Sequence, residues 1–241
     1  MSSMDLSRRC HDPEIMDDLT CSGETVRQTL RELDMINRFL GGNAVTLSGL
    51  RELLLRHNPR GGPLTVADLG CGSGDLLRRL ADYGRSRNIR MQLTGVDANP
   101  FIVSHAREHC RDYPEIQLET ENVFSDAFSR RRFDIITGTL FFHHFDDNAL
   151  ARLIRQLVGQ CRMGLLINDI HRHTFAYHSI RLLTRFFSSS TMVKYDAPLS
   201  VRRAFTRADW EGILQSAGLH DFRMSWKWAF RWQILIGGIE T

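Results

Sequence analysis

Hydrophobic positions recur along the chain at two spacings, which separate predicted helices from predicted strands. From Glu24 to Leu40 the apolar residues recur at three- and four-residue steps, which predicts an amphipathic helix ended by two glycines. A second helical pattern follows over residues 47–57, and the Gly- and Pro-rich residues 58–63 break it. We therefore expect a helical cap over residues 23–60, ahead of the main body of the domain.

Beyond this cap, short apolar runs alternate with helical patterns. The runs read LTVADLG, MQLTGVD, IQLETEN, FDIITGTLFF and GLLINDI. Such alternation is typical of a parallel sheet with helices on both faces. The clearest crossover helix begins at Asp146 or Asp147, both good N-cap residues. Its predicted buried face follows the spacing of one helix side: Leu150, Leu153, Ile154, Leu157 and Val158.

The pattern changes after the fifth apolar run. Residues 171–190 are aromatic and basic, and we expect a helical insertion over 171–200. Within it, residues 175–187 would form a substrate lid, an ordinary packed helix or a membrane-surface helix. A further helix is predicted at 206–217, with Gly218 after it. The final segment, DFRMSWKWAFRWQILIGG, holds two strands with no room for a helix between them, so they must pair as an antiparallel hairpin.

Composition limits the class of protein. The chain has 241 residues, 42% of them hydrophobic, which is enough for one α/β domain over residues 23–241. Its net charge of +3 is scattered, so nothing favours a nucleic-acid partner. Residues 1–22 are polar without a period and are predicted to be flexible or to lie over the surface. No signal peptide or membrane span is expected. The cysteines are odd in number and contain no C-x-x-C pair, which predicts free thiols and a cytoplasmic location: Cys10, Cys21, Cys71, Cys110 and Cys161.

A glycine-rich loop carries the clearest chemical signal. In VADLGCGSGD an apolar strand precedes three alternate glycines, and a helical pattern follows them. The loop lacks the lysine of a phosphate-binding P-loop. A dinucleotide fingerprint needs Gly or Ala at position 75, where Asp75 would repel a pyrophosphate. S-adenosylmethionine carries a sulfonium and an ammonium group and no phosphate, so Asp68 and Asp75 suit it. Asp97, which ends the second strand, is placed either to accept the ribose hydroxyls or to cap a helix.

These segments resemble a known family. DLGCGSGD, the VD that ends the second strand and FDIITGTLFFHHF resemble motifs I, II and IV of class I S-adenosylmethionine methyltransferases. The resemblance spans about residues 64–170. LFFHHF is similar to the L-x-H-H segment of small-molecule methyltransferases, including those of ubiquinone and menaquinone synthesis. The resemblance to this family implies a Rossmann-like fold with a seven-stranded, mostly parallel sheet, S-adenosylmethionine as the cofactor, and a small-molecule acceptor.

The resemblance also implies which residues contact the cofactor. Asn122 stands where the family usually has an aspartate that binds the adenine amino group, and Val123 would pack on the ring. Thr139 and Leu140 would line the methionine end. The full predicted set is Asp68, Gly70, Cys71, Gly72, Gly74, Asp97, Ala98, Asn122, Val123, Thr139 and Leu140.

A proton acceptor is harder to choose, because methyl transfer mainly requires alignment and, for a hydroxyl, removal of a proton. Candidates lie where strands end at the ligand-binding edge: His143, His144, Asp169, His171 and His173. His171 or His173 is favoured as the base, whereas His143 and His144 are expected to shape the cofactor site. No metal set is predicted beyond Asp169 alone. On the first cap helix, Arg27, Arg31, Asn37 or Arg38 would face either the acceptor or solvent.

The sequence therefore predicts a methyltransferase acting on the hydroxyl of an aromatic, polyketide or quinone-like molecule, as a monomer or homodimer. C-methylation of a quinol-type ring stays open, as does a cofactor-binding protein that transfers no methyl group. A nucleic-acid methyltransferase is disfavoured, because neither an N/D-P-P-Y/F signature nor a Pro-Cys nucleophile follows the fourth strand.

Overall fold

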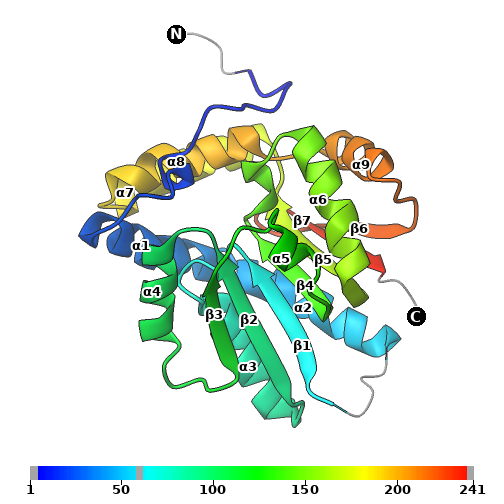
Figure 1. The fold of residues 1–241 in the computed structure, drawn as a ribbon. Coiled ribbons are helices and arrows are strands. Elements are labelled where there is room, and N and C mark those ends of the chain that lie inside the picture. The colour runs from blue at the N-terminus through cyan, green and yellow to red at the C-terminus, as the bar shows by residue number, and fades with distance from the viewer. Residues whose placement is uncertain (1–4, 58–61, 238–241) are drawn as a thin grey trace.

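The computed structural model describes residues 5–57 and 62–237, which fold around one twisted sheet. The seven strands lie in the order β3-β2-β1-β4-β5-β7-β6 (Figure 1). Strands β3, β2, β1, β4 and β5 are parallel neighbours, whereas β7 runs antiparallel to both β5 and β6. The predicted mostly parallel sheet with a C-terminal antiparallel hairpin is confirmed. The strands are β1 Leu64–Leu69, β2 Met91–Asp97, β3 Ile116–Thr120, β4 Phe133–Thr139, β5 Cys161–Ile170, β6 Phe222–Lys227 and β7 Arg231–Gly237.

Two apolar clusters hold helices against opposite faces of the sheet. One packs α2 (Gly42–Arg56), α3 (Asp75–Arg87) and α4 (Pro100–His109) against the strands. The other packs α5 (Asp126–Ser129), α6 (Asp147–Gln160) and α9 (Arg207–Ser216). Both central strands, β1 and β4, are buried almost throughout. This covering of both faces explains why their sequences are continuous apolar runs.

Several predicted helices are confirmed at the level of their caps. Asp146 is the N-cap of α6 and its carboxylate accepts a hydrogen bond from the backbone N–H of Ala149. The five predicted apolar positions of this helix are all buried. Helix α9 starts after Thr206, and Gly218 has the positive φ expected beyond its end. The capping residues in the sequence therefore predicted where α6 begins and where α9 begins and ends.

The N-terminal cap differs from the prediction in one boundary. Helix α1 (Glu24–Phe39) matches it, but α2 begins at Gly42, five residues before the predicted start at Leu47. Gly41 adopts a left-handed φ of 71°, which lets the chain turn and start a new helix at once. Of the predicted break at 58–63, residues 58–61 lie outside the described part of the chain.

The predicted insertion contains two helices. Helix α7 (Thr174–Phe187) is followed by α8 (Thr191–Arg203), and Ser190 caps the start of α8 by accepting from the backbone N–H of Val193. Large apolar side chains of α7 are exposed, including Phe175 at 71% and Phe187 at 84%. Of the helices that the structure describes, none is both long and apolar enough to cross a bilayer.

Residues 5–22, predicted to be flexible, run along α8 before they enter α1 (dark blue in Figure 1). The strap, as we call residues 5–22, contains one 3-10 turn, η1 (Ile15–Asp17). The backbone N–H groups of Ile15 and Met16 donate to the Asp196 carboxylate of α8 at 2.8 and 3.2 Å. These contacts, which the polar sequence of the strap did not predict, bring it to the ligand-binding edge of the sheet.

Candidate functional site

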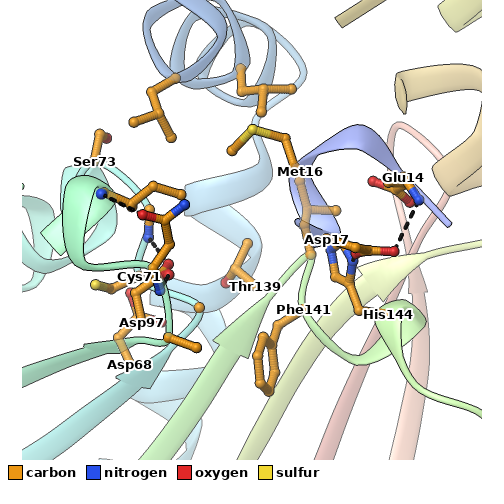
Figure 2. Close-up of a pocket in the computed structure, with 18 of the residues that line it drawn as sticks. Glu14, Met16, Asp17, Asp68, Cys71, Ser73, Asp97, Thr139, Phe141 and His144 are labelled. Carbon is orange, nitrogen blue, oxygen red and sulfur yellow. Dashed lines mark hydrogen bonds and ion pairs between the residues drawn. The ribbon is translucent and has the colours of Figure 1, made fainter. Parts of the chain in front are cut away.

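A cavity of about 800 Å³ lies at the carboxyl ends of β1, β2 and β4. The strand ends and their loops form its floor, while α1, η1 and α8 cover it. Figure 2 shows Asp68, Cys71 and Asp97 at one end and Glu14, Asp17 and His144 at the other, with Thr139 and Phe141 between them. The cavity is thus long enough to join the predicted cofactor site to a second group of polar side chains.

The glycines of the loop adopt a backbone conformation that other residues rarely reach. Gly70 and Gly72 line the cavity with φ values of 62° and 53°, in the left-handed region. A Cβ at Gly70 would lie 2.5 Å from the Phe141 ring, so glycine is required there for packing as well. Gly74 is the left-handed N-cap of α3 and does not line the cavity. Gly74 therefore shapes the loop, whereas the other two glycines present backbone to a ligand.

Two carboxyl groups stand beside this loop. Asp97 accepts hydrogen bonds from the backbone N–H groups of Gly72 at 3.3 Å and Asn99 at 3.0 Å. Asp68 is buried, and its Oδ1 has no hydrogen-bond partner. Burial, reinforced by the charge of Asp97, raises the pKa of Asp68 to about 8; burial also raises the pKa of Asp97. A cationic ligand would stabilise the ionised form of both carboxyl groups.

These raised pKa values predict a pH-dependent stability of the unliganded protein. A carboxyl group with a raised pKa in the folded state holds its proton more tightly there than in the unfolded chain. Stability is then lost as the pH rises from about 4 toward the folded-state value. For Asp68, with a folded pKa of about 8, we expect about 2 kcal/mol less unfolding free energy at pH 8 than at pH 6. Urea titrations at both pH values should show a smaller loss of unfolding free energy in Asp68→Asn than in the original protein. The exposed control Asp112→Asn should show the same loss as the original protein. Equal losses in the original protein and both variants would contradict this role of Asp68.

The remaining predicted cofactor residues all line the cavity: Cys71, Ala98, Asn122, Val123, Thr139 and Leu140. The Asn122 side-chain oxygen already accepts from the backbone N–H of Phe124 at 2.9 Å, so only its second lone pair is free for an adenine amine. Thr139 Oγ1 lies 2.8 Å from Thr46 Oγ1 on α2, which ties the end of β4 to the helical cap.

Of the five candidate proton acceptors, His143 and His144 line the cavity, whereas Asp169, His171 and His173 do not. The Nδ1 atom of His143 lies 2.8 Å from Oδ1 of Asp169, a fully buried carboxylate that also accepts from the backbone N–H groups of Phe142 and Ile170. Burial alone would raise the pKa of Asp169, but the charge and hydrogen bond of His143 hold it below its usual value. An ionised carboxylate only accepts hydrogen bonds, so it requires the proton on Nδ1 and leaves Nε2 as the acceptor of a neutral His143.

The structure does not bring His171 and His173 to the cavity, which argues against the favoured prediction for the base. His171 accepts from the indole N–H of Trp226 at 3.2 Å, and its ring packs edge-on against Trp232. His173 is the N-cap of α7 and accepts from the backbone N–H of Phe175. The chain turns away from the cavity directly after β5, and therefore both side chains support the hairpin and α7.

The second polar group of the cavity comes largely from the strap, which sequence reasoning missed. The Glu14 carboxylate is 6% exposed, accepts from the Ser200 hydroxyl at 2.9 Å and lies 3.6 Å from His143 Nε2. Burial raises its pKa to about 7 against the opposing charges of His144 and Arg203. Asp17 lies 2.6 Å from the His144 ring. Burial would raise its pKa, but hydrogen bonds from His144 and Arg203 lower it below the usual range.

Arg203 of α8 anchors the strap. Its guanidinium donates to the Asp17 carboxylate at 2.5 Å and to the backbone carbonyls of Asp12, His143 and His144 at 3.2, 3.3 and 2.8 Å. The side chain is buried, so its removal takes a charged donor away from the Asp17 carboxylate and from three backbone carbonyls.

We expect Arg203→Ala to lower the unfolding free energy by about 3 kcal/mol and to expose the strap to proteolysis. Arg203→Lys should recover little, because an ammonium cannot reproduce this planar set of donors. Thermal denaturation and limited trypsin digestion check both points, with the exposed Arg207→Ala of α9 as the control. A stable Arg203→Ala protein with a protected strap would contradict this role.

The cap helix and the predicted lid reach the cavity only in part. Asn37 of α1 lines it, but Arg27, Arg31 and Arg38 do not. Arg27 pairs with Glu108, and Arg31 with Glu24. Residues 175–187 of α7 are also absent from the lining, whereas α8 contributes Val193, Asp196, Ala197 and Ser200. Of the two insertion helices, it is therefore α8 and not α7 that covers the cavity, together with α1 and η1.

Glu14, His143 and His144 are the described residues that come nearest to a metal-ligand set, with ligand atoms within 4.8 Å of one another. Two features oppose such a site. The two imidazole rings lie 4.3 Å apart with a tilt of 32°, and their Nδ1 atoms already pair with the carboxyl groups of Asp169 and Asp17. Arg203 Nε also lies 3.8 Å from the Glu14 carboxylate. Our proposal therefore uses these groups as hydrogen-bonding and charged residues.

Comparison with known proteins agrees with the resemblance to methyltransferases seen in the sequence. A family model described as a methyltransferase domain matches residues 66–164. The ubiquinone biosynthesis O-methyltransferase of Methylobacterium sp. (strain 4-46) is 28% identical over 138 residues, which cover 54% of this chain and 51% of the relative. The protein of the same name from Coxiella burnetii (strain RSA 493 / Nine Mile phase I) is 29% identical over 115 residues, 46% of each chain. The chain thus spans about half the length of the curated relatives it matches.

Solved structures show the fold over most of the chain. The plantazolicin methyltransferase BpumL in complex with SAH is similar with a TM-score of 0.63 and 15% identity, covering 89% of both chains. Human N-acetylserotonin methyltransferase in complex with SAM is similar with a TM-score of 0.61 and 19% identity, covering 91% of this chain and 56% of that one. These likenesses confirm the predicted Rossmann-like architecture.

Proposed function

We propose that this chain transfers a methyl group from S-adenosylmethionine to a hydroxyl of a small molecule. The premise is that it carries a methyltransferase domain on the class I fold. The observation that carries the proposal is a pair of carboxyl groups, the buried Asp68 and the partly buried Asp97, beside the left-handed glycine loop in a cavity that His143 also lines. The names of the curated relatives, both O-methyltransferases, support oxygen as the methylated atom.

The residues present fit the cofactor. Asp68 Oδ1 is a buried acceptor without a partner and suits a donor from a cationic ligand. Asp97, at the end of β2, can accept from ribose hydroxyls while it keeps the Gly72 and Asn99 contacts. Gly70 and Gly72 leave backbone exposed for close approach. When bound, S-adenosylmethionine supplies a methyl group on a sulfonium, which becomes a neutral thioether as the acceptor oxygen takes the methyl.

The chain's own residues then have two tasks. Thr139, Leu140 and Phe141, at the end of β4, separate the two ends of the cavity and align an acceptor between them. His143 receives the proton of the acceptor hydroxyl on Nε2, because Asp169 fixes the tautomer and stabilises the imidazolium that forms. Glu14, 3.6 Å from Nε2, lies beside the same proton. The strap and α8 cover the cavity and limit the access of water.

Calorimetric titration with S-adenosylhomocysteine, with NADH as the competing ligand class, is the first test. We expect dissociation constants in the micromolar range for the former and no binding of the latter. S-adenosylmethionine should then support methylation within a panel of phenols and quinols, detected as a mass increase of one methyl group. Binding of NADH alone would overturn the cofactor assignment. Binding of S-adenosylhomocysteine without methyl transfer to any acceptor would leave a cofactor-binding protein.

A further inference from the structure

The charge of the cavity lining is strongly one-sided. The chain contains 31 lysines and arginines, yet none of them is among the described residues that line the cavity. Eight carboxyl groups do line it: Glu14, Asp17, Asp34, Asp68, Asp75, Asp97, Glu121 and Asp196. Five of these lie in the cofactor half of the cavity, beside the glycine loop and the ends of β1 to β3: Asp34, Asp68, Asp75, Asp97 and Glu121. Because S-adenosylmethionine is a cation, the charge of this half is complementary to its ligand. The other three carboxyl groups lie in what we call the acceptor half, and their charge must be explained by the acceptor.

The arginines nearest the acceptor half are already engaged behind the cavity wall. Arg203 is buried against Asp17 and three backbone carbonyls. Arg9 bonds to the backbone carbonyls of His143 and Phe145 and pairs with Asp147. Neither guanidinium belongs to the lining. No described lysine or arginine is therefore available to pair with an anionic group on the acceptor.

The three acidic residues of the acceptor half differ in how fully they are paired. Asp17 is bound by Arg203 and His144, and Asp196 by two backbone N–H groups of the strap. Glu14 accepts one hydroxyl donor, from Ser200 at 2.9 Å, and lies 3.8 Å from Arg203 Nε and 3.6 Å from His143 Nε2. Unlike Asp17, Glu14 accepts no hydrogen bond from a guanidinium, and it lies beside the group proposed to take the acceptor proton.

Apolar side chains make up the rest of this half. Met16, Leu19, Leu33, Val193, Ala197 and Phe141 line it, and Figure 2 shows Met16 between the two polar ends. Such walls favour an apolar body on the ligand. A carboxylate or phosphate entering here would lose its hydration and meet the Glu14 carboxyl group with no lysine or arginine of the lining to pair with it, which is strongly unfavourable.

We propose that the acceptor is an uncharged hydroxylated molecule with an apolar body, and that Glu14 excludes acceptors carrying a carboxylate or phosphate. This inference rests on the proposed function and adds the charge class of its substrate. Discrimination by an unfavourable contact with the wrong ligand is a general route to specificity. Glu14 is thus a specificity residue supplied by the strap, whereas His143 handles the proton.

Paired acceptors test the inference directly. Each pair consists of an uncharged compound and its carboxylated analogue: 4-propylcatechol with 3-(3,4-dihydroxyphenyl)propanoate, 5-propylresorcinol with 3,5-dihydroxybenzoate, and 2-naphthol with 3-hydroxy-2-naphthoate. Under saturating S-adenosylmethionine at pH 8, we expect kcat/KM to favour the uncharged member by about 100-fold. In Glu14→Gln, which keeps the shape and an acceptor for Ser200, the preference should narrow by about tenfold.

Asp12→Asn is the matched control, because it removes an exposed charge from the same strap without touching the cavity. It should keep the full preference. Equal rates within the pairs, faster transfer to the carboxylated members, or an unchanged preference in Glu14→Gln would each overturn the inference while leaving methyl transfer in place. Absence of transfer to every compound, despite S-adenosylhomocysteine binding, would instead contradict the proposed function on which it rests.

Discussion

Replacing Asp97 with alanine should weaken the binding of S-adenosylhomocysteine by about 100-fold or more. The proposed role is acceptance of two ribose hydroxyl protons by one carboxylate. Hydrogen bonds to a charged group contribute about 1.5 kcal/mol or more each, and two of them amount to about two orders of magnitude in affinity. Asp97 also accepts from the backbone N–H groups of Gly72 and Asn99, so the variant loosens the loop that must approach the ligand.

Two further variants separate these effects in calorimetric titrations. Asp97→Asn keeps an oxygen acceptor for the loop and loses the charge, so it should recover part of the affinity. Asp112→Ala removes an exposed acid whose nearest cation is 3.7 Å away, and it should bind like the original protein. If Asp97→Ala retained its affinity while remaining folded, Asp97 would be only a helix-start residue, the alternative that its sequence position left open.

The cofactor half of the site could be predicted because its signals are local. The glycines, Asp68 and Asp97 lie within one strand, turn, helix and strand, so the order of residues nearly determines their arrangement. In the structure Gly70 and Gly72 adopt the left-handed backbone that the motif required, and Asp97 reaches back to the loop. The sheet was predictable for a related reason, since short connections force neighbouring strands into few topologies.

The acceptor half depends on contacts between distant residues. Glu14 contacts His143 and Ser200, each more than a hundred positions away in the chain. The sequence of the strap has no periodic pattern that would predict these contacts. The five candidate proton acceptors, at the ends of the fourth and fifth strands, looked alike in sequence. Only the direction of the chain after β5 distinguishes His143, which faces the cavity, from His171 and His173, which support the hairpin and α7.

Replacement of His143 should have the largest effect on turnover. In His143→Ala we expect kcat to fall by about 100-fold to 10,000-fold, the range associated with a positioned general base, while S-adenosylhomocysteine binds almost unchanged. Asp169→Asn should lower kcat as well, because an amide in place of the carboxylate no longer holds the proton on Nδ1. It should also lower stability, because Asp169 is fully buried and accepts from several N–H groups.

The control is His173→Ala, which removes the N-cap of α7 at a cost of about 1 kcal/mol in stability and should leave kcat within about twofold. Rates are measured with the best uncharged acceptor at saturating concentrations of both substrates, on proteins shown to be folded by thermal denaturation. A rise in KM alone, without a fall in kcat, would mean that His143 only shapes the cavity. A kcat lost in His173→Ala but kept in His143→Ala would restore the base to the end of the fifth strand, where the sequence first suggested it. The expected pattern instead ties catalysis to the buried His143 and Asp169 pair, because only that pair combines a fixed tautomer with a ring that faces the cavity.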